Sequence, residues 1–356
     1  MTLVSDVAAT EMVNSRPTRA RHLLRVTWLE HRGMLLGLFA LLAAIAIAMV
    51  LAEMPSRAEY AQYVANNCIS NPQHAPCGTF ANWFAVSTDT VSALVIAVSA
   101  LPVVIGVFFG APSLSREFET GTFRFTFTQR VGRNRFVLST LVTFAILVII
   151  IAVCAGLLLS WLVHPFEVVG IDNQWQSGLF DATSIMLASW CVFALSLGVF
   201  LGAWLKRVVS SMAATASVVG GFLVASFMYF VKWIISVGSL TTSRLSPIGL
   251  GIGKLGLPAS FAPGAPKGSW LIRAWFAGSH GQLLSAPASL KIEEQLNSVT
   301  PKSPNSSHWL SLHHVVYDVS YQPASRFLIC QLGAAAVLVG LALVFAYLTL
   351  RRIRSV

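Results

Sequence analysis

Six long apolar stretches alternate with polar segments along the chain. Each has about 20 residues or more without a charge, the length an α-helix needs to cross a bilayer core of about 30 Å. Only Lys206 and Arg207 separate the fourth stretch from the fifth, which indicates two helices joined by a tight turn. The predicted spans are Gly33–Ala52, Thr90–Pro112, Phe136–Val163, Ala182–Leu205, Val208–Val231 and Phe327–Leu350.

The composition agrees with this pattern. The 356 residues are 55% hydrophobic and 11% charged, with a mean hydropathy of +0.71, far from the averages of soluble domains. The polar segment before Gly33 is too long for the n-region of a signal peptide, so the first stretch is predicted to be a retained helix. The sequence therefore predicts an all-α polytopic membrane protein with six transmembrane helices.

Basic residues gather beside the spans on one predicted side of the membrane. The first two loops of the other side carry only Arg57. Because cytoplasmic loops are enriched in Lys and Arg, both termini are predicted to be cytoplasmic. The net charge of +10 is then mostly an orientation signal, and no nucleic-acid partner is invoked. The basic residues of the cytoplasmic side are Arg16, Arg19, Arg21, Arg25, Arg32, Arg116, Arg124, Arg130, Arg133, Arg135, Lys206, Arg207, Arg351, Arg352 and Arg354.

This topology divides the chain into five parts. The first is a cytoplasmic segment, 1–32, in which Arg25, Trp28 and Arg32 suit an amphipathic helix lying among the inner lipid headgroups. A solvated basic tail is the alternative. The other parts are spans one to five (33–231, with a cytoplasmic segment at 111–135), an outer loop (232–326), the sixth span (327–350) and a basic cytoplasmic tail (351–356).

The outer loops carry two further signals. Cys68 and Cys77 lie nine residues apart in "NNCISNPQHAPC", where an oxidising compartment would permit a disulfide. Two unpaired thiols fit the sequence equally well. The loop 232–326 is too long for a simple connector, and its aromatic and aliphatic clusters suggest short helices packed on the outer membrane face.

No motif of a catalyst is present in the sequence. The central parts of the six predicted spans hold no ionisable residue of the kind that ion-coupled transporters place there. Metalloprotease, metal-cluster and nucleophile-elbow patterns are also missing, so we predict no catalytic and no metal-binding residues. Small residues four apart indicate close helix packing or, alternatively, a dimer seam: Gly106 and Gly110, Gly198 and Gly202, and Ala213, Ser217 and Gly221.

The cytoplasmic segment between the second and third spans carries the most specific pattern. Charges of both signs precede Gly121, which can turn the chain, and an aromatic and basic stretch follows. Such a segment suits a short helix that docks another protein; a solvated loop is the alternative.

The run "SREFETGTFRFTFTQRVGRNRF" resembles the cytoplasmic loop of permease subunits of type-2 ATP-binding-cassette (ABC) exporters, where R-E-x-x-x-G-T precedes T-Q and a basic V-x-R stretch. "RVTWLEHR" before the first span and "YQPASRF" entering the last are similar to actinobacterial-type members. One departure is "VLSTLV", with Ser139 or Thr140 where members usually have a lysine. The resemblance follows the whole chain in order and spacing.

The resemblance implies a permease half in a bacterial cell membrane, without a cofactor on this chain. A second, identical or related permease chain and a separate ATPase that binds ATP and Mg would complete the exporter. The segment 111–135 would be the coupling helix, and its candidate coupling residues would be Arg116, Glu117, Glu119, Gly121, Thr122, Gln129 and Arg133. The second and fifth spans would line a path for a hydrophobic or amphipathic substrate, with Phe108, Phe109, Phe222, Phe227, Met228 and Tyr229 as candidate walls. The alternative is a noncatalytic sensor or immunity component that binds a peptide or antibiotic through its outer loop.

Overall fold

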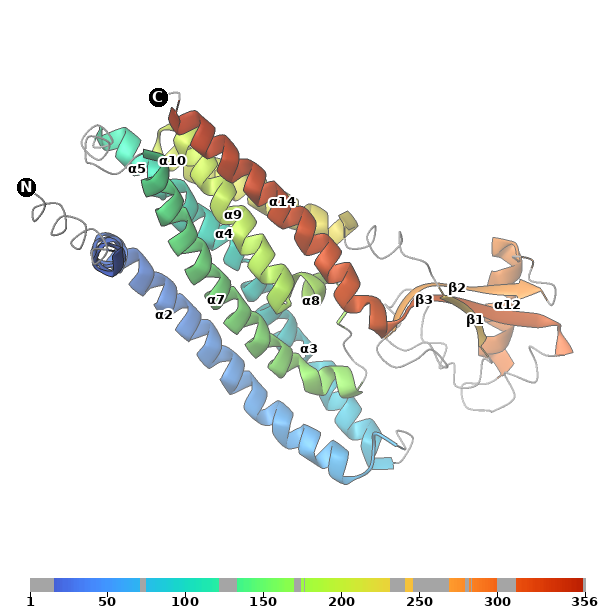
Figure 1. The fold of residues 1–356 in the computed structure, drawn as a ribbon. Helices are drawn as coiled ribbons and strands as arrows, with labels where there is room; N and C mark the ends of the chain where they lie inside the picture. The colour runs from blue at the N-terminus through green and yellow to red at the C-terminus, as the bar shows by residue number, and fades with distance from the viewer. Residues whose placement is uncertain are drawn as a thin grey trace, which may run out of the picture.

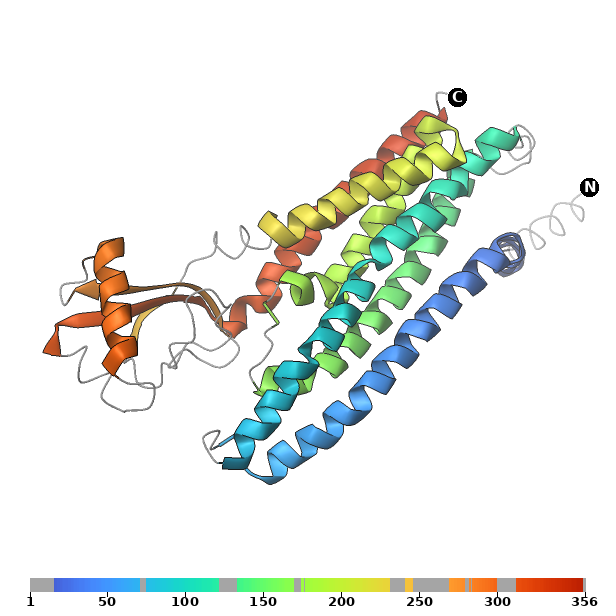
Figure 2. The ribbon, with the colours of Figure 1, turned by 180° about the vertical axis from the view of Figure 1, so that it is seen from behind.

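The structure is a computed structural model that describes residues 16–70, 75–121, 133–169, 174–175, 177–230, 241–245, 269–278, 282, 284–299 and 312–354. Long helices form one bundle, and a small sheet domain extends from one end of it (Figures 1 and 2). The bundle consists of α2 (Arg16–Ala65), α3 (Ala75–Ser99), α4 (Leu101–Ile105), the π-helical turn η1 (Gly106–Gly110), α5 (Ala111–Thr120), α7 (Arg133–Val169), α8 (Ser177–Ala182), α9 (Ser184–Leu205), α10 (Val208–Ala225), the π-helical turn η2 (Ser226–Phe230), and α14 (Phe327–Arg354), which follows the 3-10 turn η3 (Ala324–Arg326).

Five helical stretches of the described chain are long and apolar enough to cross a membrane. They are Pro76–Thr120, Leu141–Val169, Ser184–Leu205, Val208–Tyr229 and Ala324–Arg354. The predicted first span falls within α2, where the structure describes only part of the side chains, so the count of six stays a prediction. The prediction of a helical polytopic membrane protein is confirmed.

Two helices run well beyond the apolar stretches that predicted them. The stretch Pro76–Thr120 has 45 residues, about 68 Å of helix, which is more than twice the bilayer core. Helix α2 continues past its predicted end at Ala52 to Ala65, so the connection to α3 is shorter than expected. Hydropathy detects only the part of a helix that lipid covers, whereas packing between α2, α3 and α7 supports the rest.

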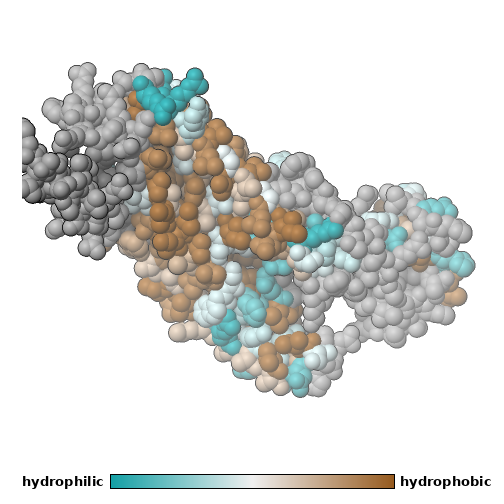
Figure 3. All heavy atoms as spheres, viewed as in Figure 1, coloured by the Kyte–Doolittle hydropathy of each residue, from teal (hydrophilic) through white to brown (hydrophobic). Residues whose placement is uncertain are grey.

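Helix α9 is the centre of the bundle. It packs against α14, α7, α5, α10 and η1, and 78% of its apolar stretch is buried, against 17% for α10. Exposed side chains of α7, α10 and α14 are instead largely apolar, and Figure 3 shows those of α7 and α14 as part of a brown band over the middle of the bundle. So large an apolar surface is costly in water and is expected against lipid tails.

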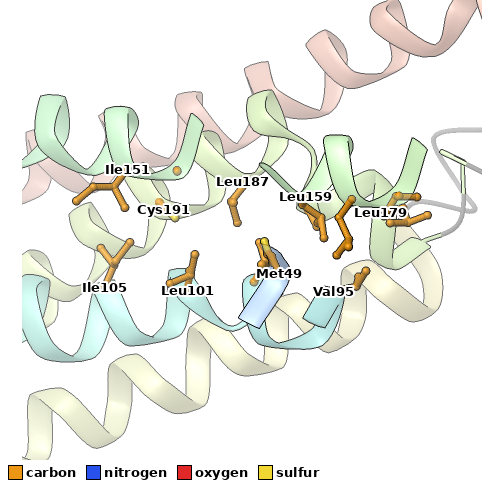
Figure 4. Close-up of a cluster of buried hydrophobic side chains, with 14 of the residues drawn as sticks. Met49, Val95, Leu101, Ile105, Ile151, Leu159, Leu179, Leu187 and Cys191 are labelled. Atoms are coloured by element: carbon orange, nitrogen blue, oxygen red, sulfur yellow. The ribbon is translucent and has the colours of Figure 1, made fainter. Parts of the chain in front are cut away.

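The largest buried cluster lies between α2, α3, α4, α7, α8 and α9. Figure 4 shows side chains from these helices pointing toward one another, among them Met49, Leu101, Ile151 and Leu187. Helix α3 ends at Ser99 and α4 begins at Leu101, with Pro102 in its first turn, where a missing N–H leaves no hydrogen bond unmade. Pro102 therefore marks a junction between two helices.

A small α/β domain occupies part of the predicted outer loop. Strands β1 (Thr241–Leu245), β2 (Trp270–Gly278) and β3 (Val315–Gln322) form an antiparallel sheet in the order β1-β3-β2, and helix α12 (Ala286–Val299) lies on one face (Figures 1 and 2). The expectation of short helices is met by α12 and is wrong for Trp270–Gly278. Backbone bonds to β3, far along the sequence, make this segment a strand.

Candidate functional site: the coupling helix and the two ends of α10

Helix α5 is the described part of the predicted coupling segment. It continues the second membrane stretch and ends at Gly121, whose φ of +71° lies in the left-handed region that glycine adopts without strain. Its first turn is buried and its last is exposed. The carboxyl end of α5 therefore projects from the bundle while its beginning is anchored within it.

Glu119 connects the end of α5 to the beginning of α10. One oxygen of its carboxylate accepts a hydrogen bond from the backbone N–H of Val208 at 2.9 Å, across 89 positions of sequence. The residue before α10, Arg207, has extended backbone and makes no side-chain cap of its own. Because the first N–H groups of a helix have no partner within it and carry partial positive charge, a carboxylate there is favourable.

Neighbouring contacts strengthen the same junction. The ammonium group of Lys206, the residue that ends α9, lies 5.7 Å from the centre of the Phe118 ring. Behind them a small apolar cluster joins α5, α7, α9 and α14 through Leu114, Leu141, Val199 and Ile353. The end of α5 is thus in direct contact with the α9–α10 turn.

Glycines let η1 and α5 touch the backbone of α9. A Cβ built on Gly198 would lie 2.5 Å from the Gly106 carbonyl oxygen, and one on Gly202 would lie 2.5 Å from the Ala111 carbonyl oxygen. A Cβ on Gly110 would lie 2.7 Å from the Leu195 carbonyl oxygen. The predicted pairs Gly106/Gly110 and Gly198/Gly202 therefore serve packing within the chain, whereas Ala213, Ser217 and Gly221 are exposed and Gly221 has no neighbour within 4 Å.

The described basic residues of the predicted cytoplasmic side lie at one end of the bundle. The end of α5, the α9–α10 turn and the carboxyl end of α14 lie together there, and the sheet domain extends from the opposite end (Figure 1). Figure 3 shows hydrophilic side chains at that end of α14. This grouping is what the charge pattern predicted for a single membrane face.

The other candidate coupling residues are distributed unevenly. Arg116 is exposed and Glu117 is half-buried on α5, while Thr122 and Gln129 lie outside the described residues. Arg133 is the first residue of α7. Arg25, Trp28 and Arg32 belong to α2, in a part whose side chains the structure does not describe, so their interfacial role stays a prediction.

At the opposite end of the bundle, a disulfide links two helices covalently. Cys68 and Cys77 form a disulfide with a Cα–Cα distance of 5.5 Å, joining the end of α2 to α3. Nearby, Arg57 pairs with the buried Glu53, donates a hydrogen bond to the Trp161 carbonyl oxygen at 2.9 Å and lies 4.8 Å from the Trp161 ring. These contacts tie α2 to α3 and α7.

A buried carboxylate holds the end of α10 that lies away from Glu119, and sequence reasoning missed it. Asp181 of α8 is 6% exposed and accepts hydrogen bonds from the Ser226 hydroxyl at 2.9 Å and from the Trp190 indole N–H at 3.3 Å. Burial raises the pKa of Asp181 to about 6, although both hydrogen bonds counter that rise. The sequence signal was an aspartate directly before an apolar stretch; the predicted span began at Ala182, whereas α9 begins at Ser184.

The candidate path residues separate into two groups. Phe108, Phe222, Phe227 and Tyr229 are about half exposed or more, as is Met228. Phe109 is instead buried in the main core and cannot line a path in this conformation. Both π-helical turns, η1 and η2, lie in the stretches that carry the exposed aromatics, and such turns are frequent at functional sites.

A protein-family model described as "ABC-2 membrane transporter related" matches residues 39–231, more than half of the chain. The chain belongs to this family. The match reaches from within α2 to just beyond η2, so it contains the coupling helix α5 and both ends of α10. Searches of curated proteins and of solved structures found no match.

Membership in the ABC-2 membrane transporter related family relates the contacts of α5, α9 and α10 to transport. The chain is a multi-pass membrane component of an ABC transporter. The sheet domain and α14 lie outside the matched residues. Helix α5, anchored on α9 and bonded to α10, is accordingly the candidate site of coupling.

Proposed function

We propose that this chain is the permease subunit of an ATP-driven exporter in a bacterial cell membrane, with both termini cytoplasmic. A separate ABC ATPase, which binds ATP and Mg, docks against the end of α5 and the basic ends of the bundle. A second permease chain completes the transporter. ATP binding brings the ATPase subunits together and moves α5, which shifts the spans between inward- and outward-facing arrangements.

The Glu119–Val208 hydrogen bond is the observation that carries this proposal. It joins a helix positioned to contact a cytoplasmic partner to the first N–H of the fifth span. The glycine contacts of Gly198 and Gly202 make the beginning of α5 rigid against α9. Displacement of the α5 end therefore acts on the end of α10, the span that the resemblance places on the path.

The substrate follows from the exposed surface of α10 and η1. Helix α10 has only 17% of its apolar stretch buried, and Phe108, Phe222, Phe227 and Tyr229 project from this surface. A second permease chain facing it would enclose an uncharged, aromatic path. Such a path favours a hydrophobic or amphipathic substrate over an inorganic ion, because an ion would enter without charged or polar groups to replace its water.

Affinity capture from the native host tests the coupling. Tagged wild type is compared with Arg116→Ala/Glu117→Ala, which alters the projecting end of α5, and with Glu294→Ala, which alters an exposed residue of α12 in the sheet domain. We expect wild type and Glu294→Ala to recover an ATPase with a phosphate-loop motif, and the α5 variant to recover at least about tenfold less at equal membrane expression. Equal recovery by all three would refute the role of α5.

A sensor or immunity component is the competing function. Its specificity would depend on the sheet domain, so Glu294→Ala and other α12 variants would change the response to a peptide or antibiotic while α5 variants would not. Absence of any ATPase from all captures, with the protein folded, would favour this second function. ATP-dependent uptake of a fluorescent amphiphile into inverted vesicles, whose outer face is the cytoplasmic one, would exclude it.

A further inference from the structure

The fifth span is held at both ends by a carboxylate from another element. At the beginning of α10 this is the exposed Glu119, which belongs to the coupling machinery described above. At the outer end it is Asp181, which the coupling mechanism does not use. Figure 2 shows α8 beside the outer end of α10, and α8 packs against η2.

The surroundings of Asp181 offer it polar donors but few charges. Helices α3 and α9 and the turn η2 pack against α8, and their sequences contain no Lys, Arg or His. Their titratable side chains are Asp89, the buried Cys191 and Tyr229. Helix α7 also borders α8, and its Glu167 lines a cavity together with Leu179 and Ala182 of α8. Helix α14 also contacts α8, through the Phe327–Phe180 ring pair, and Arg326 directly precedes it. The favourable contributions to the ionised form are the hydrogen bonds from Ser226 and Trp190.

The contact between Asp181 and Ser226 also lies where the regular α-helix of the fifth span gives way to a π-helical turn. Ser226 is buried and begins the π-helical turn η2, whereas the next three residues, Phe227, Met228 and Tyr229, are exposed. Glycines bring the backbone of η1 into close contact with the backbone of α9. The turn η2 is instead attached to α8 through the hydrogen bond from the Ser226 hydroxyl to Asp181. A second polar contact lies close by, where the Gln331 side chain of α14 donates to Thr183, the residue between α8 and α9.

We propose that Asp181 is a positioning residue for transport: it holds the outer end of α10 against α8 through Ser226, and loss of its proton releases that end. The role in transport rests on the proposed function. The contact between Asp181 and Ser226, called the latch below, is a property of this chain alone.

The direction of the proton effect follows from burial. Asp181 has its pKa raised from 3.8 to about 6 when it is buried against η2. The released carboxylate, in water, would have the ordinary value, so the latched state binds the proton more tightly. The latch is therefore firm at pH 5 and weakens as the pH rises through about 6. A pKa difference of about 2 units allows a shift of up to about a hundredfold in the equilibrium.

Spin-label distances on the purified permease in lipid nanodiscs, without an ATPase, test the latch. The free cysteines Cys154, Cys191 and Cys330 are replaced by Ala, and the Cys68–Cys77 disulfide is kept. One label pair reports the outer ends of α10 and α14 (Tyr229→Cys with Ile329→Cys), and a control pair reports their other ends (Val209→Cys with Tyr347→Cys); all four sites are exposed.

We expect the outer pair to give a narrow distance distribution at pH 5 and a longer or broader one at pH 8, with a midpoint near 6, while the control pair does not change. Asp181→Asn, which is neutral and keeps an oxygen for the Trp190 N–H, should stay narrow at both pH values. Ser226→Ala, a smaller change than removal of the carboxylate, should broaden the outer pair at pH 5.

Two results would overturn the proposal. One is an outer pair that has the same pH response in Asp181→Asn as in wild type, which would assign the response to another group. The other is an outer pair that Ser226→Ala leaves narrow. If the latch behaves as expected but no ATPase is captured, the proposed function fails and the latch stands; if the ATPase is captured and the distances do not respond, the reverse holds.

Discussion

The two ends of α10 show how the same chemical group works in water and away from it. Glu119 lies on the surface and accepts the Val208 N–H, so solvent and salt screen its charge. Asp181 is buried, and its two hydrogen bonds do not fully offset the loss of water. The exposed contact is therefore sensitive to salt, whereas the strength of the buried contact depends on pH.

The largest expected effect comes from removing the buried carboxylate. Asp181→Ala leaves the Ser226 hydroxyl and the Trp190 N–H without their acceptor, and each unsatisfied buried donor costs about 1–3 kcal/mol. At pH 5 we expect the thermal unfolding midpoint in detergent to fall by several degrees. An unchanged midpoint at pH 5 would show that the site relaxes and that the buried end is no firmer than the exposed one.

The second-largest expected effect is a pH dependence of stability that arises at the Asp181 end of α10. The folded-state pKa of Asp181 is raised, so its protonated form stabilises the fold below about pH 4, and this contribution is lost as the pH rises through about 6. Two pKa units correspond to about 3 kcal/mol. Wild type should therefore lose stability relative to Asp181→Asn between pH 4 and pH 7, measured by unfolding at each pH; parallel curves would contradict the assignment.

Packing beneath the coupling helix comes third. Gly198→Ala places a methyl group 2.5 Å from the Gly106 carbonyl oxygen, and overpacking of this kind costs about 1–3 kcal/mol. Gly220→Ala, on the open face of α10 with nothing within 4 Å, is the matched control and should be neutral or slightly stabilising. Transport should fall with Gly198→Ala alone. Equal behaviour of both variants would mean that α5 does not depend on its contact with α9.

The smallest effect is expected at Glu119. Glu119→Gln keeps an oxygen for the Val208 N–H but removes the charge near the beginning of α10, a change of about 0.3–1 kcal/mol that added salt should diminish. Unfolding midpoints of the two proteins should converge as the salt concentration is raised. A difference that persists at high salt would indicate that the contact is less exposed than the structure shows, which would bring the two ends of α10 closer in character.

Sequence patterns were most informative wherever the environment of a segment depends on the segment itself. Apolar length predicted the membrane stretches, and the basic residues predicted which described ends lie together. Gly121 predicted the turn that ends α5. The extra length of α2 and α3 was not predictable, because hydropathy does not detect the polar part of a helix that is stabilised by packing against neighbouring helices.

The site shows the same division. The sequence by itself determined that this is a helical membrane protein, that the segment 111–135 resembles the cytoplasmic loop of ABC permeases, and that glycines permit close packing. Only the tertiary structure decided that Glu119 meets Val208, that Gly198 meets Gly106, and that Asp181 is buried against Ser226 and Trp190. The physical reason is that most of these partners lie far apart along the chain, and Asp181 and Trp190 lie on different helices. They meet only because α5, α8 and α10 pack around α9.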